Sequence, residues 1–184
     1  MQTPHRRLFS RTRLGAAAVA VGATLALAVP GVAHAAQSGT TDVGAMAKLT
    51  HAQATAKFKA KGITWSSSGG CSDRNKSNCT SFDQINSATV DGVITLKSAS
   101  GCAIRLTGGT ETGHASGTYS HWNGYKVDIG MTSCLTSYIK NHFSSIGGSK
   151  WKSASGNVYY NESNHWDVTY YNCGGCLAPN RAGI

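Results

Sequence analysis

Two short stretches of this sequence hold residue types that bind metal ions. The stretch SHWNGYKVDIG places His121 and Asp128 in the pattern His-x6-Asp. The later stretch NESNHWDV contains Glu162 three residues before His165. Two imidazoles and one carboxylate make a normal catalytic zinc set, which leaves the fourth coordination position for water. The pattern therefore predicts a zinc centre with His121, Asp128 and His165 as ligands.

A strand is needed to present the carboxylate of this set. We predict a strand over residues 125–129, which follows a turn at Gly124. Side chains alternate between the two faces of a strand, so Val127 packs on one face and Asp128 points to the other. His121 can fold back over that second face and meet Asp128.

The late histidine belongs to a predicted hairpin. Residues 157–172 are rich in aromatic and β-branched residues, which favours two strands joined by a turn near residues 162–164. Asp167 lies two residues beyond His165 and therefore shares its strand face. From there the Asp167 carboxylate could support a ligand imidazole from outside the metal's own ligands.

The other segments complete an α+β domain with a small, mostly antiparallel sheet and flanking helices. Residues 90–97 fit a helix or a strand, and we prefer a helix because their apolar residues recur at helical spacing. The further predicted elements are a short helix over residues 51–62 capped by Thr50, a strand over residues 102–109, and a helix that begins at Thr132 or Ser133 and stops at Gly147 and Gly148.

The N-terminal segment has the composition of an export signal. Arginines near the start precede a long apolar run, which leads to the small-x-small cleavage pattern Ala33-His34-Ala35. Pro30 and Gly31 interrupt the run, so no stable membrane anchor is expected. We therefore predict a secreted protein, extracellular or associated with the cell wall, by ordinary or twin-arginine export.

The export signal and the short helix divide the chain into three predicted segments. The short helix could be a surface helix of the main domain or part of a removable pro-segment. The predicted segments are a signal peptide over residues 1–35, an N-terminal tail with the short helix over residues 36–68, and a main domain over residues 69–184 that carries the predicted zinc centre.

The net charge bears on partners. Removing the four arginines of the export signal from the 17 basic residues leaves 13 against 8 acidic ones, a net charge of +5. This moderate charge suits adhesion to an anionic wall polymer. The lysines are scattered rather than clustered with aromatic residues, so nucleic-acid binding is not indicated, and a monomer is expected.

All six cysteines lie beyond the export signal, and an even number in an oxidising compartment indicates three disulfides. Of the 15 pairings that sequence allows, proximity favours two short loops and leaves one long-range pair. A Cys-Gly-Gly-Cys redox pair or a zinc ribbon is the alternative for the last two. The predicted pairs are Cys71 with Cys79, Cys102 with Cys134, and Cys173 with Cys176.

Taken together, the motifs resemble a known family. The pattern SxHxxGxxxDI at residues 120–129, followed by ExxHxD at residues 162–167, is similar to that of the zinc D-alanyl-D-alanine peptidases and their phage endolysin relatives. That family acts on bacterial peptidoglycan peptides and shares a fold with the hedgehog signalling domain. The resemblance covers residues 104–170, implies the same His-Asp-His ligand set, and makes Glu162 the catalytic base.

The resemblance implies a secreted zinc metallopeptidase with one zinc per chain. Its substrate would be a peptidoglycan peptide, cleaved as a D,D-carboxypeptidase or an endopeptidase. The alternative is a non-catalytic cell-wall-binding or zinc-structured module with the same fold. An intact Glu162 favours the enzyme.

The sequence departs from the family pattern in two places. Thr107-Gly108-Gly109-Thr110 stands where the family carries an arginine that grips the substrate's terminal carboxylate. Tyr125 and Lys126 stand where the family has smaller residues before the aspartate. Arg105 lies close to the first departure and could contact substrate, or it could be a surface residue of its strand.

Two further residues are candidates for substrate contact. His114, in the glycine-rich stretch GTETGHASG, could contact substrate or form a hydrogen bond near the metal, although a flexible loop histidine is the simpler interpretation. Trp122 flanks a predicted ligand and could line a cleft or pack beside the site.

Overall fold

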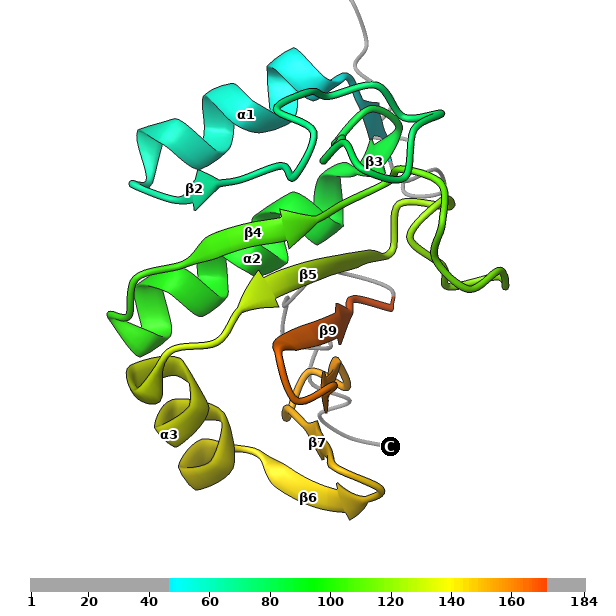
Figure 1. Ribbon diagram of the computed structural model, residues 1–184. Coiled ribbons are helices and arrows are strands. Elements are labelled where there is room, and N and C mark those ends of the chain that lie inside the picture. The colour runs from blue at the N-terminus through cyan, green and yellow to red at the C-terminus, as the bar shows by residue number, and fades with distance from the viewer. Residues whose placement is uncertain (1–46, 172–184) are drawn as a thin grey trace, which may run out of the picture. The chain divides into compact units, whose positions relative to one another are not determined.

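The computed structural model describes residues 47–171, which fold around a seven-stranded sheet (Figure 1). The predicted signal peptide and the predicted pair of Cys173 with Cys176 lie outside these residues. None of the helices within the described residues is long and apolar enough to cross a membrane. The three helices are α1 (His51–Ala60), α2 (Ser87–Ser100) and α3 (Ser133–His142).

Helix α1 begins with a capping box. The Thr50 hydroxyl accepts a hydrogen bond from the Gln53 N–H at 3.3 Å, and the Gln53 side chain accepts one from the Thr50 N–H at 2.9 Å. These two bonds satisfy N–H groups that a helix start otherwise leaves unpaired. The inner face of the helix buries Ala54 and Phe58, and the turn ends at Gly62 with φ +66°. The predicted short helix is confirmed.

The predicted helix at residues 90–97 is also confirmed, as the centre of α2. Val90, Val93 and Leu96 are buried on one side of it. Gly101 ends the helix in the left-handed conformation, with φ +67°, which is accessible to glycine at little cost.

The predicted end of the third helix is wrong. Helix α3 begins as expected, with the Thr132 hydroxyl accepting from the Leu135 N–H at 3.1 Å, but it stops at His142. Phe143 turns to an extended conformation, and the next residues pair as a strand. Of the two glycines that suggested a helix stop, Gly147 instead ends a strand and Gly148 forms the tight turn of a hairpin together with Ser149, all three with a positive φ.

The sheet is larger than predicted and mixed in direction. Its strands are β2 (Thr64–Trp65), β4 (Arg105–Gly108), β5 (Lys126–Gly130), β6 (Ser144–Gly147), β7 (Lys150–Lys152), β8 (Val158–Asn161) and β9 (His165–Thr169), and a separate pair joins β1 (Lys48–Leu49) to β3 (Ile85–Asn86). The order in the sheet is β2-β4-β5-β9-β8-β7-β6, and only the pairing of β2 with β4 is parallel. The expectation of a small sheet is therefore wrong, because the hairpin after α3 and the short β2 extend it at both edges.

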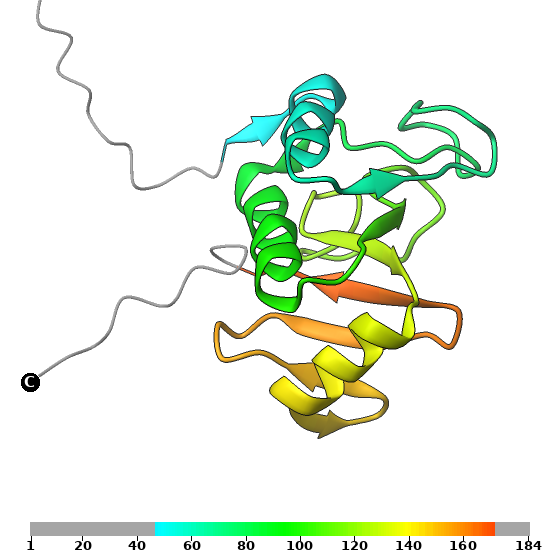
Figure 2. The ribbon, with the colours of Figure 1, turned by 90° about the vertical axis from the view of Figure 1, so that its left-hand side faces the viewer.

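The core lies on one face of the central strands. Helix α2 runs beside β4 and β5 in both views of the ribbon (Figures 1 and 2). Val127 and Ile129 of β5 and Trp166 and Val168 of β9 are fully buried in the same cluster as α2. Strand alternation then leaves the residues between them on the opposite face.

The N-terminal helix and strand share this core. Phe58 of α1 and Ile63 are buried in it, and β2 pairs with β4. Burying an aromatic side chain of this size is a large apolar contribution. Residues 51–65 therefore contribute to the same folded unit as the segment from residue 69 onward.

Two of the predicted disulfides are confirmed, Cys71 with Cys79 and Cys102 with Cys134. The first closes a loop with a sequence separation of 8, and the second links the end of α2 to the start of α3 across 32 residues. Longer loops lose more unfolded-state entropy when they are closed.

We expect loss of the disulfide between Cys102 and Cys134 to destabilise the protein more than loss of the disulfide between Cys71 and Cys79. Replacing both Cys102 and Cys134 with serine should lower the free energy of unfolding by about 2–5 kcal/mol. The matched control removes Cys71 and Cys79 in the same way and should cost less, because its loop is shorter. Denaturant unfolding of both variants measures this, and an equal or reversed order would contradict the expectation.

Candidate metal centre

The neighbouring strands β5 and β9 carry two of the predicted residues on one face. Asp128 lies directly opposite Asp167, and Gly130 lies opposite His165. Asp128 points away from the core while Val127 is fully buried in it, as the predicted strand requires. The two motifs, more than 30 residues apart in the sequence, are thus brought together by strand pairing.

His121 reaches this face from the turn that precedes β5. The turn closes with a hydrogen bond from the Gly124 N–H to the His121 carbonyl at 2.8 Å. Gly124 has φ +77°, and a Cβ there would lie 2.5 Å from the Gln84 carbonyl oxygen. Only glycine fits this position, which explains its place in the motif.

The ring of His121 is held in one orientation. It is 3% exposed, and its Nδ1 lies 2.7 Å from the Gly109 carbonyl oxygen. A carbonyl oxygen can only accept, so Nδ1 carries the hydrogen and, in the neutral ring, Nε2 is the free nitrogen. That Nε2 faces Asp128 Oδ1 at 3.3 Å and has no hydrogen-bond partner.

His165 repeats this arrangement from the other side. Its Nδ1 lies 2.7 Å from Asn164 Oδ1, and its Nε2 lies 3.4 Å from Asp128 Oδ1. The same Nε2 is 3.2 Å from Glu162 Oε2. The turn that holds both residues closes with the Glu162 N–H donating to the His165 carbonyl at 3.1 Å. Two imidazole nitrogens therefore converge on one carboxylate oxygen, with Glu162 beside them.

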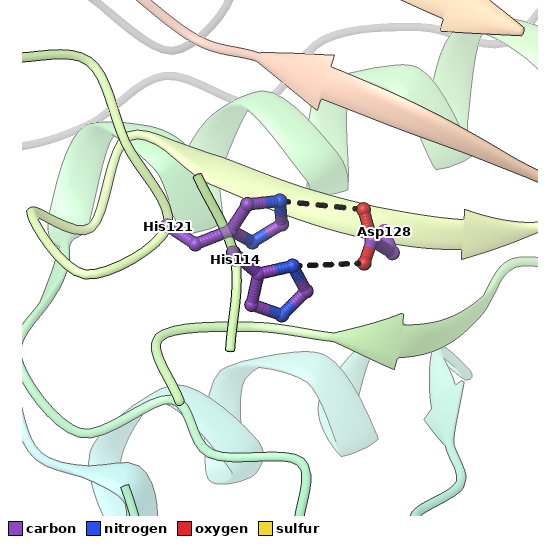
Figure 3. A group of neighbouring side chains, drawn as sticks. All are labelled: His114, His121 and Asp128. Carbon is purple, nitrogen blue, oxygen red and sulfur yellow. Dashed lines mark ion pairs between the residues drawn. The ribbon is translucent and has the colours of Figure 1, made fainter. Parts of the chain in front are cut away.

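His114 belongs to the site as well, although sequence favoured a simple loop residue. Its ring stacks on that of His121, with centroids 3.8 Å apart (Figure 3). Its Nδ1 lies 3.8 Å from Asp128 Oδ2, the carboxylate oxygen that His121 and His165 do not face. Within the described residues, His114, His121 and Asp128 offer ligand atoms that all lie within 4.8 Å of one another.

Glu111 supports this cluster and was not identified from the sequence. It is 2% exposed, and its carboxylate accepts hydrogen bonds from the Ser81 N–H at 2.7 Å and the Gly109 N–H at 3.0 Å. His114 Nε2 lies 3.3 Å from the same carboxylate. Burial would raise the pKa of Glu111, but these hydrogen bonds outweigh it and lower the pKa, so the group is ionised at neutral pH.

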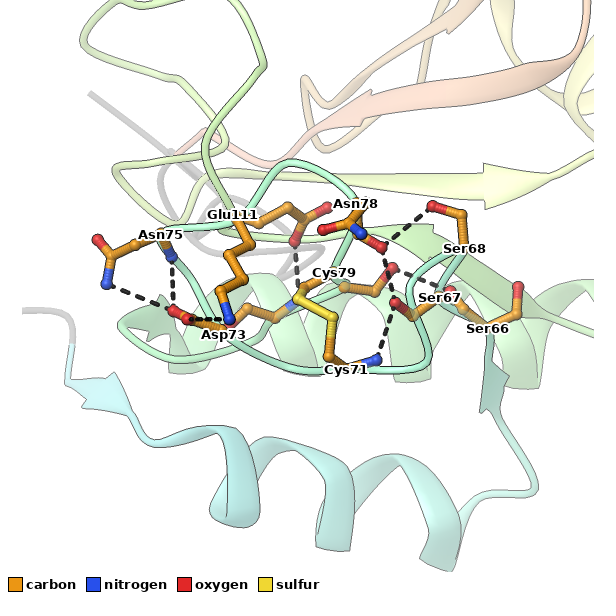
Figure 4. The surroundings of a disulfide bond; sticks show 12 residues. Ser66, Ser67, Ser68, Cys71, Asp73, Asn75, Asn78, Cys79 and Glu111 are labelled. Atoms are coloured by element: carbon orange, nitrogen blue, oxygen red, sulfur yellow. Dashed lines mark hydrogen bonds and ion pairs between the residues drawn. A yellow bond between two sulfur atoms is a disulfide. The ribbon is translucent and has the colours of Figure 1, made fainter.

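The loop closed by the disulfide between Cys71 and Cys79 lies next to Glu111 (Figure 4). Within this loop, the Arg74 side chain donates from Nε to the Thr110 carbonyl at 3.1 Å. The Arg74 carbonyl accepts from the Thr112 N–H at 2.9 Å. The backbone on both sides of Glu111 is thus fixed by a disulfide-bonded loop.

An open cavity of about 300 Å³ lies over these side chains. It contains all four residues predicted to bind zinc or act as base, together with His114 and Asp167. The lining residues are Gly113, His114, Ala115, His121, Lys126, Asp128, Glu162, His165 and Asp167.

Asp167 does not support a ligand imidazole in the way expected. The outer nitrogens of His121 and His165 are held by a backbone carbonyl and by Asn164 instead. Asp167 pairs with Lys126 at 2.8 Å, and its Oδ2 lies 3.8 Å from the inner nitrogen of His121. Lys126, one of the departures from the family pattern, thus supplies the countercharge for a second carboxylate in the cavity.

Two candidates for substrate contact lie outside this cavity. Arg105 is exposed on β4 and does not line it. Trp122 is 44% exposed and stacks under the Arg74 guanidinium, 3.7 Å from ring centroid to guanidinium carbon. It lines a neighbouring cavity of about 250 Å³, and His114 lines both cavities. Trp122 thus lines a cavity, which is one of its two predicted interpretations, and substrate contact by either residue stays a prediction.

The charges around His121, His165 and Asp128 favour a bound cation. Burial would lower the pKa of His121, but the nearby carboxylates of Asp128 and Asp167 outweigh it and raise the pKa to about 9. The Asp128 carboxylate likewise raises the pKa of His165, against partial burial. Burial would raise the pKa of Asp128, yet the two imidazoles hold it well below its ordinary value. Without a metal ion, a proton fills the role of the cation.

The spacing around Asp128 matches that of zinc ligands. Tetrahedral zinc with bonds of about 2.0–2.1 Å places neighbouring ligand atoms about 3.3 Å apart. The distances from Asp128 Oδ1 to the two Nε2 atoms are 3.3 and 3.4 Å. His121 Nε2 and Asp128 Oδ1 are also buried without a hydrogen-bond partner, which is rare unless an ion or water binds there. Within the described residues, however, the group whose ligand atoms all lie within 4.8 Å of one another is His114, His121 and Asp128, and His165 is not part of it.

Zinc affinity should rise with pH, because zinc binds only neutral imidazoles. In the metal-free protein the pKa of His121 is raised from 6.5 to about 9, so its ion pairs stabilise the fold fully below pH 6.5 and are lost as pH rises through 9. Zinc must displace that proton, and its apparent affinity should climb over the same window. Calorimetry in two buffers of different ionisation enthalpy measures the proton release. Affinity that is flat from pH 6.5 to 9 would contradict this assignment.

Comparison with known proteins finds no matching family, no matching curated protein and no matching solved structure. The resemblance to the zinc D-alanyl-D-alanine peptidases therefore stays a prediction based on the two motifs. The structure adds an α+β fold and a cluster of histidines and carboxylates that could hold a metal ion.

Proposed function

We propose that the protein is a secreted zinc metallopeptidase that hydrolyses peptide bonds of bacterial peptidoglycan. One observation carries the proposal: the inner nitrogens of His121 and His165 converge on one buried oxygen of Asp128, and Glu162 lies 3.2 Å from His165 at the same cavity. Three ligands with a free carboxylate beside them form a catalytic rather than a purely structural arrangement.

Each side chain has a distinct task in this reaction. When bound, zinc would polarise the substrate carbonyl and acidify a water molecule. His121, Asp128 and His165 would hold the ion, and the outer nitrogens of both histidines are already fixed by hydrogen bonds, which limits reorganisation during the reaction. Glu162 is the partly exposed carboxylate of the cavity, so it can take a proton from water and deliver it to the leaving amine.

The substrate class rests on the motif and on the chain's export signal. The cavity is open and polar, which suits an extended peptide rather than an apolar ligand. Lys126 is its only lysine or arginine among the described residues, and it is paired with Asp167. The family's carboxylate-binding arginine has no counterpart at residues 107–110, so carboxypeptidase and endopeptidase activities are separated by experiment. The net positive charge favours retention on anionic wall polymers.

Digestion of purified peptidoglycan tests the proposal. Fragments released by the protein are identified by mass spectrometry, with zinc, with chelator, and with chelator followed by zinc. New peptide termini that vanish with chelator and return with zinc support the enzyme, and their positions show which bond is cut. Binding to peptidoglycan without new termini would support the alternative, a non-catalytic wall-binding module with the same fold.

A further inference from the structure

We infer that His114 is a fourth protein ligand of the metal centre and that Glu111 positions it. The inference rests on the proposed zinc centre, but it concerns two residues outside the His121, Asp128 and His165 set. The two residues are three positions apart, in the same Glu-x-x-His spacing as Glu162 and His165, but only the folded loop between β4 and β5 brings them to the metal centre.

The ring nitrogens of His114 are arranged as in a metal ligand. Nε2 lies 3.3 Å from Glu111 Oε1, and an ionised carboxylate can only accept. In the neutral ring, Nε2 therefore carries the hydrogen and Nδ1 is free. That Nδ1 faces Asp128 Oδ2 at 3.8 Å. His121 and His165 show the same division, with the outer nitrogen bonded to an oxygen and the inner one facing Asp128.

Glu111 has the properties of an orienting carboxylate. Metal-binding histidines commonly donate their second ring N–H to a carboxylate or a carbonyl. Glu111 is buried, and a buried carboxylate is costly unless hydrogen bonds satisfy it. The Ser81 N–H donates to Oε2 and the Gly109 N–H to both oxygens, while Oε1 also faces His114 Nε2. Gly109 also holds His121 through its carbonyl, so one carboxylate organises both rings.

The loop backbone delivers His114 to this position. Gly113 has φ +103°, and a Cβ there would lie 2.8 Å from the Cβ of Ser77. The chain can pass this closely only because residue 113 is glycine. The ring that follows then stacks on His121, and its nearest ligand atom falls within 4.8 Å of those of His121 and Asp128.

This ligand would cap the resting centre. Four protein ligands fill a tetrahedral zinc site, whereas a catalytic site keeps one position open. Water and substrate would therefore reach the ion only after His114 withdraws. Its side chain is 27% exposed and lines the neighbouring cavity as well, so the ring could move toward that cavity.

Zinc affinity of matched variants tests the inference. The purified full chain, His114→Ala and Glu111→Gln are titrated against a competing chelator, with His142→Ala as the control. His142 is exposed on α3, and its ring contacts the Tyr138 carbonyl at 2.9 Å, away from the centre. We expect zinc binding to weaken about 10–100-fold in both test variants and to stay unchanged in the control.

A second measurement on the unaltered chain guards against misfolding of the variants. Long-range ¹H–¹⁵N NMR spectra report which ring nitrogen of each histidine is bound. Addition of zinc to the metal-free protein should shift His114 Nδ1 together with the Nε2 atoms of His121 and His165.

The possible outcomes separate this inference from the proposed function. Zinc that binds with unchanged affinity in His114→Ala, with His114 Nδ1 unshifted, would overturn the fourth ligand and leave the three-ligand centre intact. A chain that binds no zinc at all would overturn both.

Discussion

The Glu162→Gln variant is expected to bind zinc normally and to hydrolyse peptidoglycan about 10²–10⁴-fold more slowly. Gln has nearly the same shape as Glu but cannot accept a proton at neutral pH. Glu162 contacts His165 at 3.2 Å without sharing the Asp128 oxygen, so its loss should leave the ligand set in place. Zinc content and release of peptide termini, measured on the same preparation, give the result.

The matched control for this variant is Asp91→Asn. Asp91 is an exposed carboxylate of α2 that pairs with Lys57, and it should change neither zinc content nor rate. Near-native hydrolysis by a zinc-loaded Glu162→Gln protein would show that another group takes the proton and that Glu162 is not the base.

The Asp128→Asn variant is expected to lose stoichiometric zinc and all hydrolysis that depends on it. Asp128 supplies the oxygen on which His121 and His165 converge, so no other single change removes as much of the ligand set. It also leaves the buried His121 without its nearest countercharge. Breaking a buried ion pair in this way typically costs about 3–5 kcal/mol, and unfolding of the metal-free proteins at pH 6 should show the loss.

Asp167→Asn is the matched control. Asp167 lies directly across the strand pair from Asp128, is similarly buried, and is paired with Lys126. If Asp128 binds the metal and Asp167 does not, the Asp167→Asn variant should retain one zinc per chain. Loss of zinc in both variants, or in neither, would mean that Asp128 has been given the wrong role.

Local signals explain what could be predicted from the sequence. Thr50 and Thr132 cap helices through hydrogen bonds to residues three positions away, and Gly101 stops a helix with its own conformation. The strand containing Asp128 follows from alternation within five residues. Such features depend on neighbours in the chain, and so pattern reasoning finds them.

What could not be predicted depends on contacts far apart in the sequence. Gly147 and Gly148 suit a helix end and a hairpin turn equally well, and only the pairing of β6 with β7 decides between them. Glu111 has no local mark of burial, because its partner Ser81 is 30 residues away. His114 depends on Glu111 and was therefore undervalued for the same reason.

The most direct measurement of the zinc centre is anomalous X-ray scattering from crystals of the protein grown with one equivalent of zinc. Data collected above and below the zinc absorption edge locate the ion without assumptions about the ligands. We predict one strong peak within bonding distance of His121 Nε2, Asp128 Oδ1 and His165 Nε2. No peak in this cavity, or a peak bound to none of these three atoms, would contradict it.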